Sequence, residues 1–223
     1  MLDIKELAME LGSTDPKIKD DAVGVLWDAA RNGADISAAI SSLANLLWDE
    51  DVSIRSDVAV TLENAAKHGA DMSAAISALA AALSDADMRV QGSASSALQI
   101  AVADVNSCHA ALSELVESFS YGTGRWRAAM ALEGSIGKCP SLEAVDAAEA
   151  RLREEYDALK QKRWYGKEAE LARIGVSFSR LINETAKRRD ALAANRDIML
   201  DDKPKPPKQG PMYQKIRRVL TNG

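Results

Sequence analysis

The residues best suited to nucleophilic or acid–base chemistry are few in this sequence. The two histidines are His68 and His109, and the two cysteines are Cys108 and Cys139. Cys108 and His109 are neighbours in a segment with helical character, so their side chains diverge and do not form the hydrogen-bonded pair that cysteine catalysis requires. The cysteines lack the CxxC spacing of metal and redox sites, which favours two small buried apolar residues in a reducing compartment.

The familiar catalytic motifs are missing from the sequence. It contains no HExxH, no GxSxG and no P-loop lysine after a glycine-rich turn. Residues 121–125 include a GxG sequence, but no strand precedes it, which favours a turn between helices. The sequence therefore predicts a protein that is not an enzyme, with no catalytic residue, no metal site and no cofactor.

An internal repeat determines the expected architecture. Residues 32–41 recur as residues 68–77, an offset of 36 residues. A fourth copy is two residues shorter, and the four copies align at Leu26, Leu62, Leu98 and Leu132. A period of this length indicates stacked supersecondary units, each burying its apolar face against its neighbours.

Each unit is expected to contain two helices. In the second copy, apolar spacings of three and four residues predict helices over residues 36–48 and 52–67, joined by an acidic turn at residues 49–51. The first inward residues of the second helices are Ile18, Ile54 and Val90, whereas offsets such as that of Ser56 point away from the core.

Residues at the helix ends agree with this division. Gly33 and Gly69 occupy positions where a helix ends in a left-handed cap. Asp35 and Asp71 precede the next helix as N-caps, and Pro16 opens the first long helix.

The turn and the second helix resemble HEAT repeats, in particular the bacterial type related to phycobilin-lyase-like HEAT proteins. The pattern is an Asp-x-Asp turn followed by Val/Ile-Arg and a distant leucine, found over residues 49–62 and, in part, residues 85–98. The resemblance covers about residues 15–150 and implies a right-handed α-solenoid of about four helix pairs. It also implies that Arg55 ties neighbouring repeats through turn carboxylates, a ladder expected to break where Gln91 replaces the arginine.

The chain is expected to have three parts: a HEAT-like solenoid over residues 1–140, a cap of two long helices over residues 141–196, and a Pro/Lys-rich tail over residues 197–223. The helices of the cap are predicted over residues 142–162 and 166–195. A capping hairpin would cover apolar surface that an open last repeat exposes.

Charge is unevenly distributed along the chain. Residues 1–150 hold 10 of the 28 basic and 23 of the 33 acidic side chains, so they carry a net charge of −13 against +8 for residues 151–223. Such a division suggests two surfaces with different partners, or an acidic end that meets another molecule's basic end. The alternative is that these charges solvate two helical faces.

The candidate binding residues come from the outward positions of the second helices, which line the concave face in HEAT-like stacks. Apolar side chains at these positions are candidate anchors, and acidic ones would set the polarity of the groove: Trp27, Val60, Trp126, Met130, and Asp20, Glu63, Glu133. Tryptophan is enriched at binding hot spots. The alternative places Trp27 beneath the N-terminal helix and Trp126 against the C-terminal hairpin.

These residues favour a protein–protein interaction module, such as a scaffold, an accessory subunit or an assembly factor of a larger complex. One alternative is nucleic-acid binding by the basic C-terminal part, which includes Arg188 and Arg189, although acidic repeats argue against it. Another, implied by the family resemblance, is enzymatic or cofactor handling, but no residue marks a chromophore pocket.

The tail supplies a further hypothesis. It could dock on protein, or on an anionic membrane, through Lys203, Lys205, Lys208, Tyr213, Lys215, Arg217 and Arg218. Docking on an acidic groove of its own kind would make the protein self-associate. No apolar stretch reaches the roughly 18–20 residues needed to cross a bilayer, and the amphipathic N-terminus does not resemble a signal peptide. The sequence therefore predicts a cytoplasmic protein for which a membrane partner is not expected.

Overall fold

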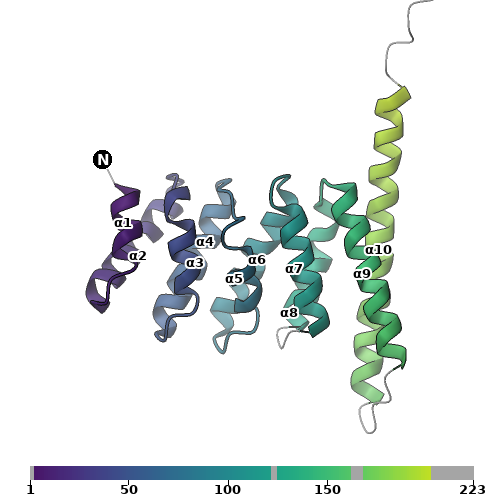
Figure 1. Cartoon of the computed structure of the whole chain (residues 1–223), viewed down its shortest axis with the longest axis horizontal. Coiled ribbons are helices and arrows are strands. Elements are labelled where there is room, and N and C mark those ends of the chain that lie inside the picture. The colour runs from purple at the N-terminus through teal and green to yellow at the C-terminus, as the bar shows by residue number, and fades with distance from the viewer. Residues whose placement is uncertain (1–2, 122–124, 162–167, 202–223) are drawn as a thin grey trace, which may run out of the picture.

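The computed structural model describes residues 3–121, 125–161 and 168–201 (Figure 1), and within these ranges it contains helices and no strand. The α-helices are α1 (Ile4–Glu10), α2 (Pro16–Arg31), α3 (Ile40–Leu46), α4 (Val52–Lys67), α5 (Ile76–Ala82), α6 (Met88–Ala103), α7 (Cys108–Tyr121), α8 (Arg125–Ser135), α9 (Leu142–Gln161) and α10 (Glu168–Asp201). Two short 3-10 helices are η1 (Ser37–Ala39) and η2 (Ile136–Lys138).

The helices stack as antiparallel pairs in two layers. Helices α2, α4, α6 and α8 pack side by side in one layer, and α1, α3, α5 and α7 lie against them in the other. Helices α9 and α10 pack on each other at the C-terminal end, where α9 contacts α7 and α10 contacts α8. The predicted all-α solenoid of about four helix pairs with a C-terminal hairpin is confirmed.

Local sequence explains where the second helix of each pair begins. Asp15, Asp51 and Asp87 are N-caps whose carboxylates accept the backbone N–H two residues further on, at 2.9, 2.8 and 2.8 Å. The left-handed conformation expected at Gly33 and Gly69 is present, with φ of 76° and 85°. The aspartate caps recur every 36 residues, and α2, α4 and α6 are each 16 residues long.

Two helix boundaries differ from the predicted ones. The helix expected over residues 36–48 begins as the 3-10 turn η1 and becomes α-helical at Ile40, an arrangement common at helix N-termini. Helix α10 continues to Asp201, beyond the predicted end at residue 195. The division into parts at residues 140 and 196 stays a prediction.

The core is built from the repeated positions. Leu26, Leu62, Leu98 and Leu132 are fully buried. The orientation predictions for Ile18 and Ser56 are wrong: Ile18 is exposed and Ser56 is buried. In the layer of α2, α4, α6 and α8, helix α2 has a neighbour on one side only, and this leaves Ile18 exposed. Helix α4 lies between α2 and α6, and Ser56 is buried there.

A polar ladder joins neighbouring repeats, as the family resemblance implied for Arg55. Its guanidinium donates to both Asp85 oxygens, at 2.7 and 3.2 Å, and to the carbonyl of Asp49 at 2.8 Å. One repeat earlier, Lys19 Nζ donates to Asp49 Oδ2 at 2.6 Å. Burial alone would raise the pKa of Asp49 and of Asp85, but the hydrogen bonds and charges of Lys19 and Arg55 hold both pKa values below the usual value.

The expected break in this ladder at Gln91 does not occur. The Gln91 amide Nε2 donates to the carbonyl of Asp85 at 2.6 Å, and its Oε1 accepts from Arg127 Nε at 3.1 Å. An amide both donates and accepts, so the ladder continues into α8 through a neutral side chain.

Candidate functional site

Two large apolar side chains are exposed on α8, in the layer formed by α2, α4, α6 and α8. Trp126 is 71% exposed and Met130, one turn further on, is 47% exposed. The opposite side of α8 is buried, with Ala128 and Leu132 in the core. The alternative in which Trp126 packs against the C-terminal hairpin is therefore wrong.

Trp27 lies at the other end of the same layer, on α2. Its side chain is half-buried, and the Arg31 guanidinium sits 5.1 Å from the centre of its ring. A cation in this position is attracted to the ring face. Helices α4 and α6 separate α2 from α8, and helices pack about 8–10 Å apart, so the two tryptophans do not form one cluster.

Glu63 of α4, predicted to set the polarity of the groove, is already engaged. Its Oε1 accepts from Lys67 at 2.7 Å and from Ser96 Oγ of α6 at 2.9 Å. Burial alone would raise the pKa of Glu63, but the hydrogen bonds from Lys67, Ser93 and Ser96 hold it below its usual value. Glu63 thus joins α4 to α6, and its carboxylate is not free to bind a partner.

The other predicted site residues are spread along the layer. Val60 is half-buried on α4 and Asp20 is exposed on α2. Glu133 lies on α8, 3.4 Å from the Arg180 guanidinium of α10. Of the predicted set, the structure brings together Trp126, Met130 and Glu133 on α8.

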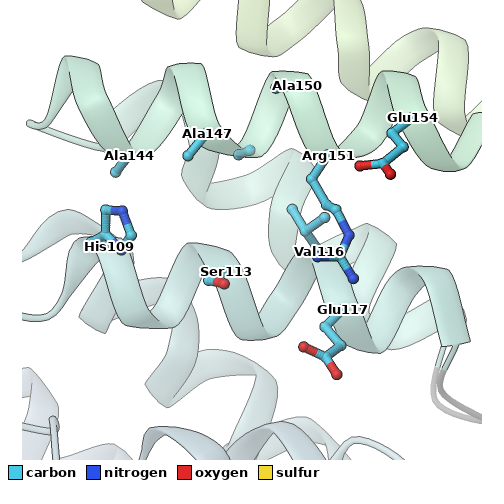
Figure 2. Close-up of a pocket in the computed structure, with 10 residues that line it drawn as sticks. His109, Ser113, Val116, Glu117, Ala144, Ala147, Ala150, Arg151 and Glu154 are labelled. Atoms are coloured by element: carbon cyan, nitrogen blue, oxygen red, sulfur yellow. The ribbon is translucent and has the colours of Figure 1, made fainter.

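A groove that the sequence did not suggest lies on the other layer, between α7 and α9 (Figure 2). Its volume is about 310 Å³. Figure 2 shows His109 and Ser113 of α7 facing Ala144 and Ala147 of α9, with Arg151 reaching from α9 toward α7. The signal that could have revealed this groove is the four alanines within residues 144–150, because small side chains leave space between neighbouring helices.

The polar side chains of the groove include His109 and Ser113 of α7. In the part of the chain that the structure describes, no hydrogen bond joins these two side chains. Within the same ranges, no group of three or more His, Cys, Asp or Glu side chains could hold a metal ion. Arg151 pairs with Glu155 of its own helix at 3.4 Å.

The two cysteines, 31 positions apart in the chain, contact each other in the core. Both are buried. The Cys108 thiol donates a hydrogen bond to the carbonyl of Val105, and the Cys139 thiol donates one to the carbonyl of Ser141. Burial raises the pKa of the Cys139 thiol, and the Cys108 thiol raises it further. His109, by contrast, is exposed.

Two arginines of α10, Arg188 and Arg189, bind groups elsewhere in the fold. Arg188 Nε donates to the carbonyl of Cys139 at 2.9 Å, and Arg189 Nη1 donates to the buried Glu149 of α9 at 2.8 Å. Neither guanidinium is therefore free to follow a phosphate backbone, which weakens the nucleic-acid alternative. The predicted docking residues of the tail, from Lys203 to Arg218, lie outside the described residues.

No family model matches this sequence, and no curated protein matches it. Solved structures do match the fold. A computationally designed armadillo repeat protein for modular peptide recognition has a TM-score of 0.50 at 18% identity, over 86% of this chain and 89% of its own. An engineered protein also reaches 0.50, at 19% identity over 92% and 91% of the two chains.

A third structure, a designed armadillo repeat protein in complex with the peptide (KR)4, has a TM-score of 0.45 at 16% identity over 81% of this chain and 100% of its own. The two similarities with a TM-score of 0.50 define the class of fold, a helical-repeat solenoid similar to armadillo repeat proteins. Among the described helices, none is both long enough and apolar enough to cross a membrane.

Proposed function

We propose that this chain is a non-catalytic protein-interaction module. A partner segment binds along the layer formed by α2, α4, α6 and α8, with its main anchors at Trp126 and Met130. The partner is another protein, and the chain acts as an accessory subunit or assembly factor of the resulting complex. The HEAT-like assignment, supported by the Arg55 ladder, and the cytoplasmic location remain part of this proposal.

The observation that carries the proposal is the exposure of Trp126 and Met130 one turn apart on α8. Neither side chain contributes much to the core, because the buried face of α8 is made of alanines and Leu132. Large apolar side chains gathered on a soluble surface mark contact sites, and a truncated tryptophan anchor costs about 2 kcal/mol or more of binding energy. The designed armadillo protein for peptide recognition is an example of a similar solenoid put to such use.

Three of the other predicted residues take secondary roles. Trp27 is a second, weaker anchor because Arg31 already covers part of its ring. Glu63 holds α4 against α6, and Glu133 is shared with Arg180, so the acidic side chains shape the surface more than they attract the partner.

The experiment is a capture followed by an affinity measurement. The full chain is immobilised, proteins retained from a lysate of the source organism are identified, and the affinity of the purified partner is measured. The W126A/M130A double variant is expected to bind at least thirtyfold more weakly, since about 2 kcal/mol corresponds to that factor.

The matched control is Val105→Ala, which removes an exposed apolar side chain from the opposite end of the helix pairs. This variant is expected to bind like the wild type. Equal affinity of the W126A/M130A variant and the wild type would exclude the proposed face. Retention of nuclease-sensitive nucleic acid in place of protein would favour the alternative function.

A further inference from the structure

Two thiols meet where the repeat stack joins the C-terminal hairpin. Cys108 is the first residue of α7, and Cys139 follows η2 and precedes α9. Cys108 is 2% exposed and Cys139 is 0% exposed, so both side chains lie in the core. They are the two cysteines of the chain, so any disulfide within one molecule must join these residues.

The topology of the fourth helix pair explains why the two cysteines meet. Helix α7 ends at Tyr121, α8 begins at Arg125, and the two helices pack against each other as an antiparallel pair. Cys108 lies 13 positions before the end of α7, and Cys139 lies 14 positions after the start of α8. At about 1.5 Å a residue, both cysteines lie about 20 Å from the end at which the chain passes from α7 to α8. They are therefore at the same level of the pair.

The two thiols contact each other and are held only weakly by other groups. Burial raises the pKa of the Cys139 thiol, and its contact with the Cys108 thiol raises it further. The Cys108 thiol donates to the carbonyl of Val105 at 3.5 Å, and the Cys139 thiol donates to the carbonyl of Ser141 at 3.6 Å. Because S–H is a weak donor, the loss of these two hydrogen bonds on oxidation would cost little.

A groove opens beside the thiol pair. The groove between α7 and α9 is lined at one end by His109, the residue after Cys108, and by Ala144, three residues after Ser141. Figure 2 shows the side chains of His109 and Ala144 facing each other across the groove. The groove therefore gives a small molecule a path to the region of the two cysteines, although the cysteines themselves are covered.

A cation lies beside Cys139. Arg188 Nε of α10 donates to the carbonyl of Cys139 at 2.9 Å. Burial raises the pKa of the Cys139 thiol, and the positive charge of Arg188 opposes this rise in part. A nearby cation favours the thiolate, which is the form that reacts with oxidants. Cys139 thus has a neighbour that an inert buried cysteine lacks.

We infer that Cys108 and Cys139 form a peroxide-sensitive dithiol site, in which oxidation joins the two ends of the fourth helix pair by a disulfide. One thiolate attacks an oxygen of hydrogen peroxide, the O–O bond breaks, and the cysteine becomes a sulfenic acid. The hydroxide that leaves takes up the proton released by the thiol and forms water. The second thiol then attacks the sulfenic sulfur, the S–S bond forms, and a second water leaves. Two thiols are oxidised to one disulfide, and one peroxide is reduced to two waters.

The disulfide would change the fold locally. It would close a loop from residue 108 to residue 139 that contains α7 and α8, and a disulfide that closes a loop stabilises the folded state. The bond would thus fasten the helix pair that carries Trp126 and Met130. The inference does not rest on the proposed binding face, because formation of the disulfide is measured without a partner.

The test uses the full chain, first reduced and then treated with excess hydrogen peroxide under native conditions. Intact mass spectrometry is expected to show the loss of two hydrogen atoms, and peptide mapping to show the Cys108 segment joined to the Cys139 segment. The treated protein should migrate as a monomer on a non-reducing gel, and dithiothreitol should restore both thiols. The midpoint of thermal unfolding is expected to rise by about 5 °C or more on oxidation.

Variants identify the groups that take part. Cys108→Ser and Cys139→Ser are each expected to abolish the loss of two hydrogen atoms within one chain. Arg188→Gln is expected to slow disulfide formation several-fold, whereas the matched control Arg180→Gln, on the same helix, should leave the rate unchanged. Circular dichroism checks that each variant is folded.

Several outcomes would overturn the inference. The native wild type could keep both thiols in peroxide, or it could gain oxygen atoms at either cysteine and form no disulfide. A disulfide that joins two chains, or one that forms only after guanidinium chloride unfolds the protein, would also contradict it. A disulfide that lowers the unfolding midpoint would do the same, because the two sulfur atoms would then not be positioned to bond in the native stack.

Discussion

The guanidinium of Arg55 and the carboxylate of Asp85 join two neighbouring repeats through a pair of hydrogen bonds of 2.7 and 3.2 Å. Arg55 also donates to the carbonyl of Asp49 in its own repeat. One side chain thus joins two successive turns of the stack.

Replacing Arg55 by alanine is expected to lower the free energy of unfolding by about 2 kcal/mol, because hydrogen bonds to charged groups that are partly shielded from water are worth about 1.5–3 kcal/mol. Arg55→Lys should lie between alanine and the wild type, since lysine cannot form the two-pronged contact. Urea unfolding gives the values. The matched control is Arg89→Ala at the equivalent turn, where the arginine is 69% exposed and should contribute no more than about 0.5 kcal/mol. Equal effects of Arg55→Ala and Arg89→Ala would contradict this account.

Acidification is expected to weaken the ladder. The folded pKa values of Asp49 and Asp85 lie below their usual value, so the stability that these carboxylates contribute is fully present above the unfolded pKa of about 3.9 and is lost as the pH falls through the folded pKa. Asp85→Asn removes one of them. The difference in unfolding free energy between the wild type and Asp85→Asn should therefore be largest near neutral pH and shrink below about pH 4. A difference that stays constant over this range would show that Asp85 acts by shape alone.

Replacing glycine by alanine should lower the stability of the fold at Gly69 and raise it at Gly24. Gly33 and Gly69 have positive φ, so Gly69→Ala should cost about 1 kcal/mol of stability. Gly24 lies within α2, and a Cβ there would meet no atom within 4 Å, so Gly24→Ala should add about 0.5–1 kcal/mol through helix propensity. Denaturant unfolding of the two single variants measures both effects. Destabilisation by Gly24→Ala would mean that this glycine has a role in packing.

Trp126→Ala is expected to change the free energy of unfolding by less than about 0.5 kcal/mol, because exposed surface substitutions rarely exceed that range. Leu132→Ala, on the buried side of the same helix, should cost about 2–5 kcal/mol. Thermal unfolding of the two variants tests this contrast. A large loss of stability in Trp126→Ala would assign that side chain to packing and remove the main support for the binding face.

The two thiols are expected to react slowly with a disulfide reagent in the native protein. Cys108 and Cys139 are both buried, and the pKa of Cys139 is raised by that burial, so little reactive thiolate is available. Both should react quickly once guanidinium chloride unfolds the chain. Fast modification of either cysteine at a rate well above that of global unfolding would show that the region between α7 and α9 opens locally.

Much of the fold could be predicted from the residues alone because its signals are local and repeated. The left-handed Gly33 and Gly69 were expected from short stretches of sequence. Asp51 was predicted only as part of a turn, and the structure shows that it and Asp87 also cap the following helices. The ladder through Arg55 followed from a motif. The continuation through Gln91 could not be predicted, because it depends on Arg127 of the next repeat reaching the amide.

The candidate surfaces were harder to predict. Periodicity places Trp126 and Met130 on the outward side of α8, and both are exposed. The same reasoning placed Ile18 inward and Ser56 outward, and both assignments were wrong because burial depends on whether a neighbouring helix lies on each side. Trp48 was predicted to be the last residue of the helix over residues 36–48. In the structure α3 ends at Leu46, so Trp48 lies in the turn that follows and is exposed.

By itself, the sequence determined that this chain forms a stack of helix pairs, since a 36-residue period, apolar spacings of three and four, and capping residues act within one repeat or between adjacent ones. Only the tertiary structure decided which side chains remain in contact with water, which carboxylates keep an unpaired charge, and which distant residues, such as Cys108 and Cys139, meet. The reason is physical: exposure and pairing depend on the packing of one repeat against the next, and that packing is set by residues 30 or more positions apart in the chain, such as Arg55 and Asp85.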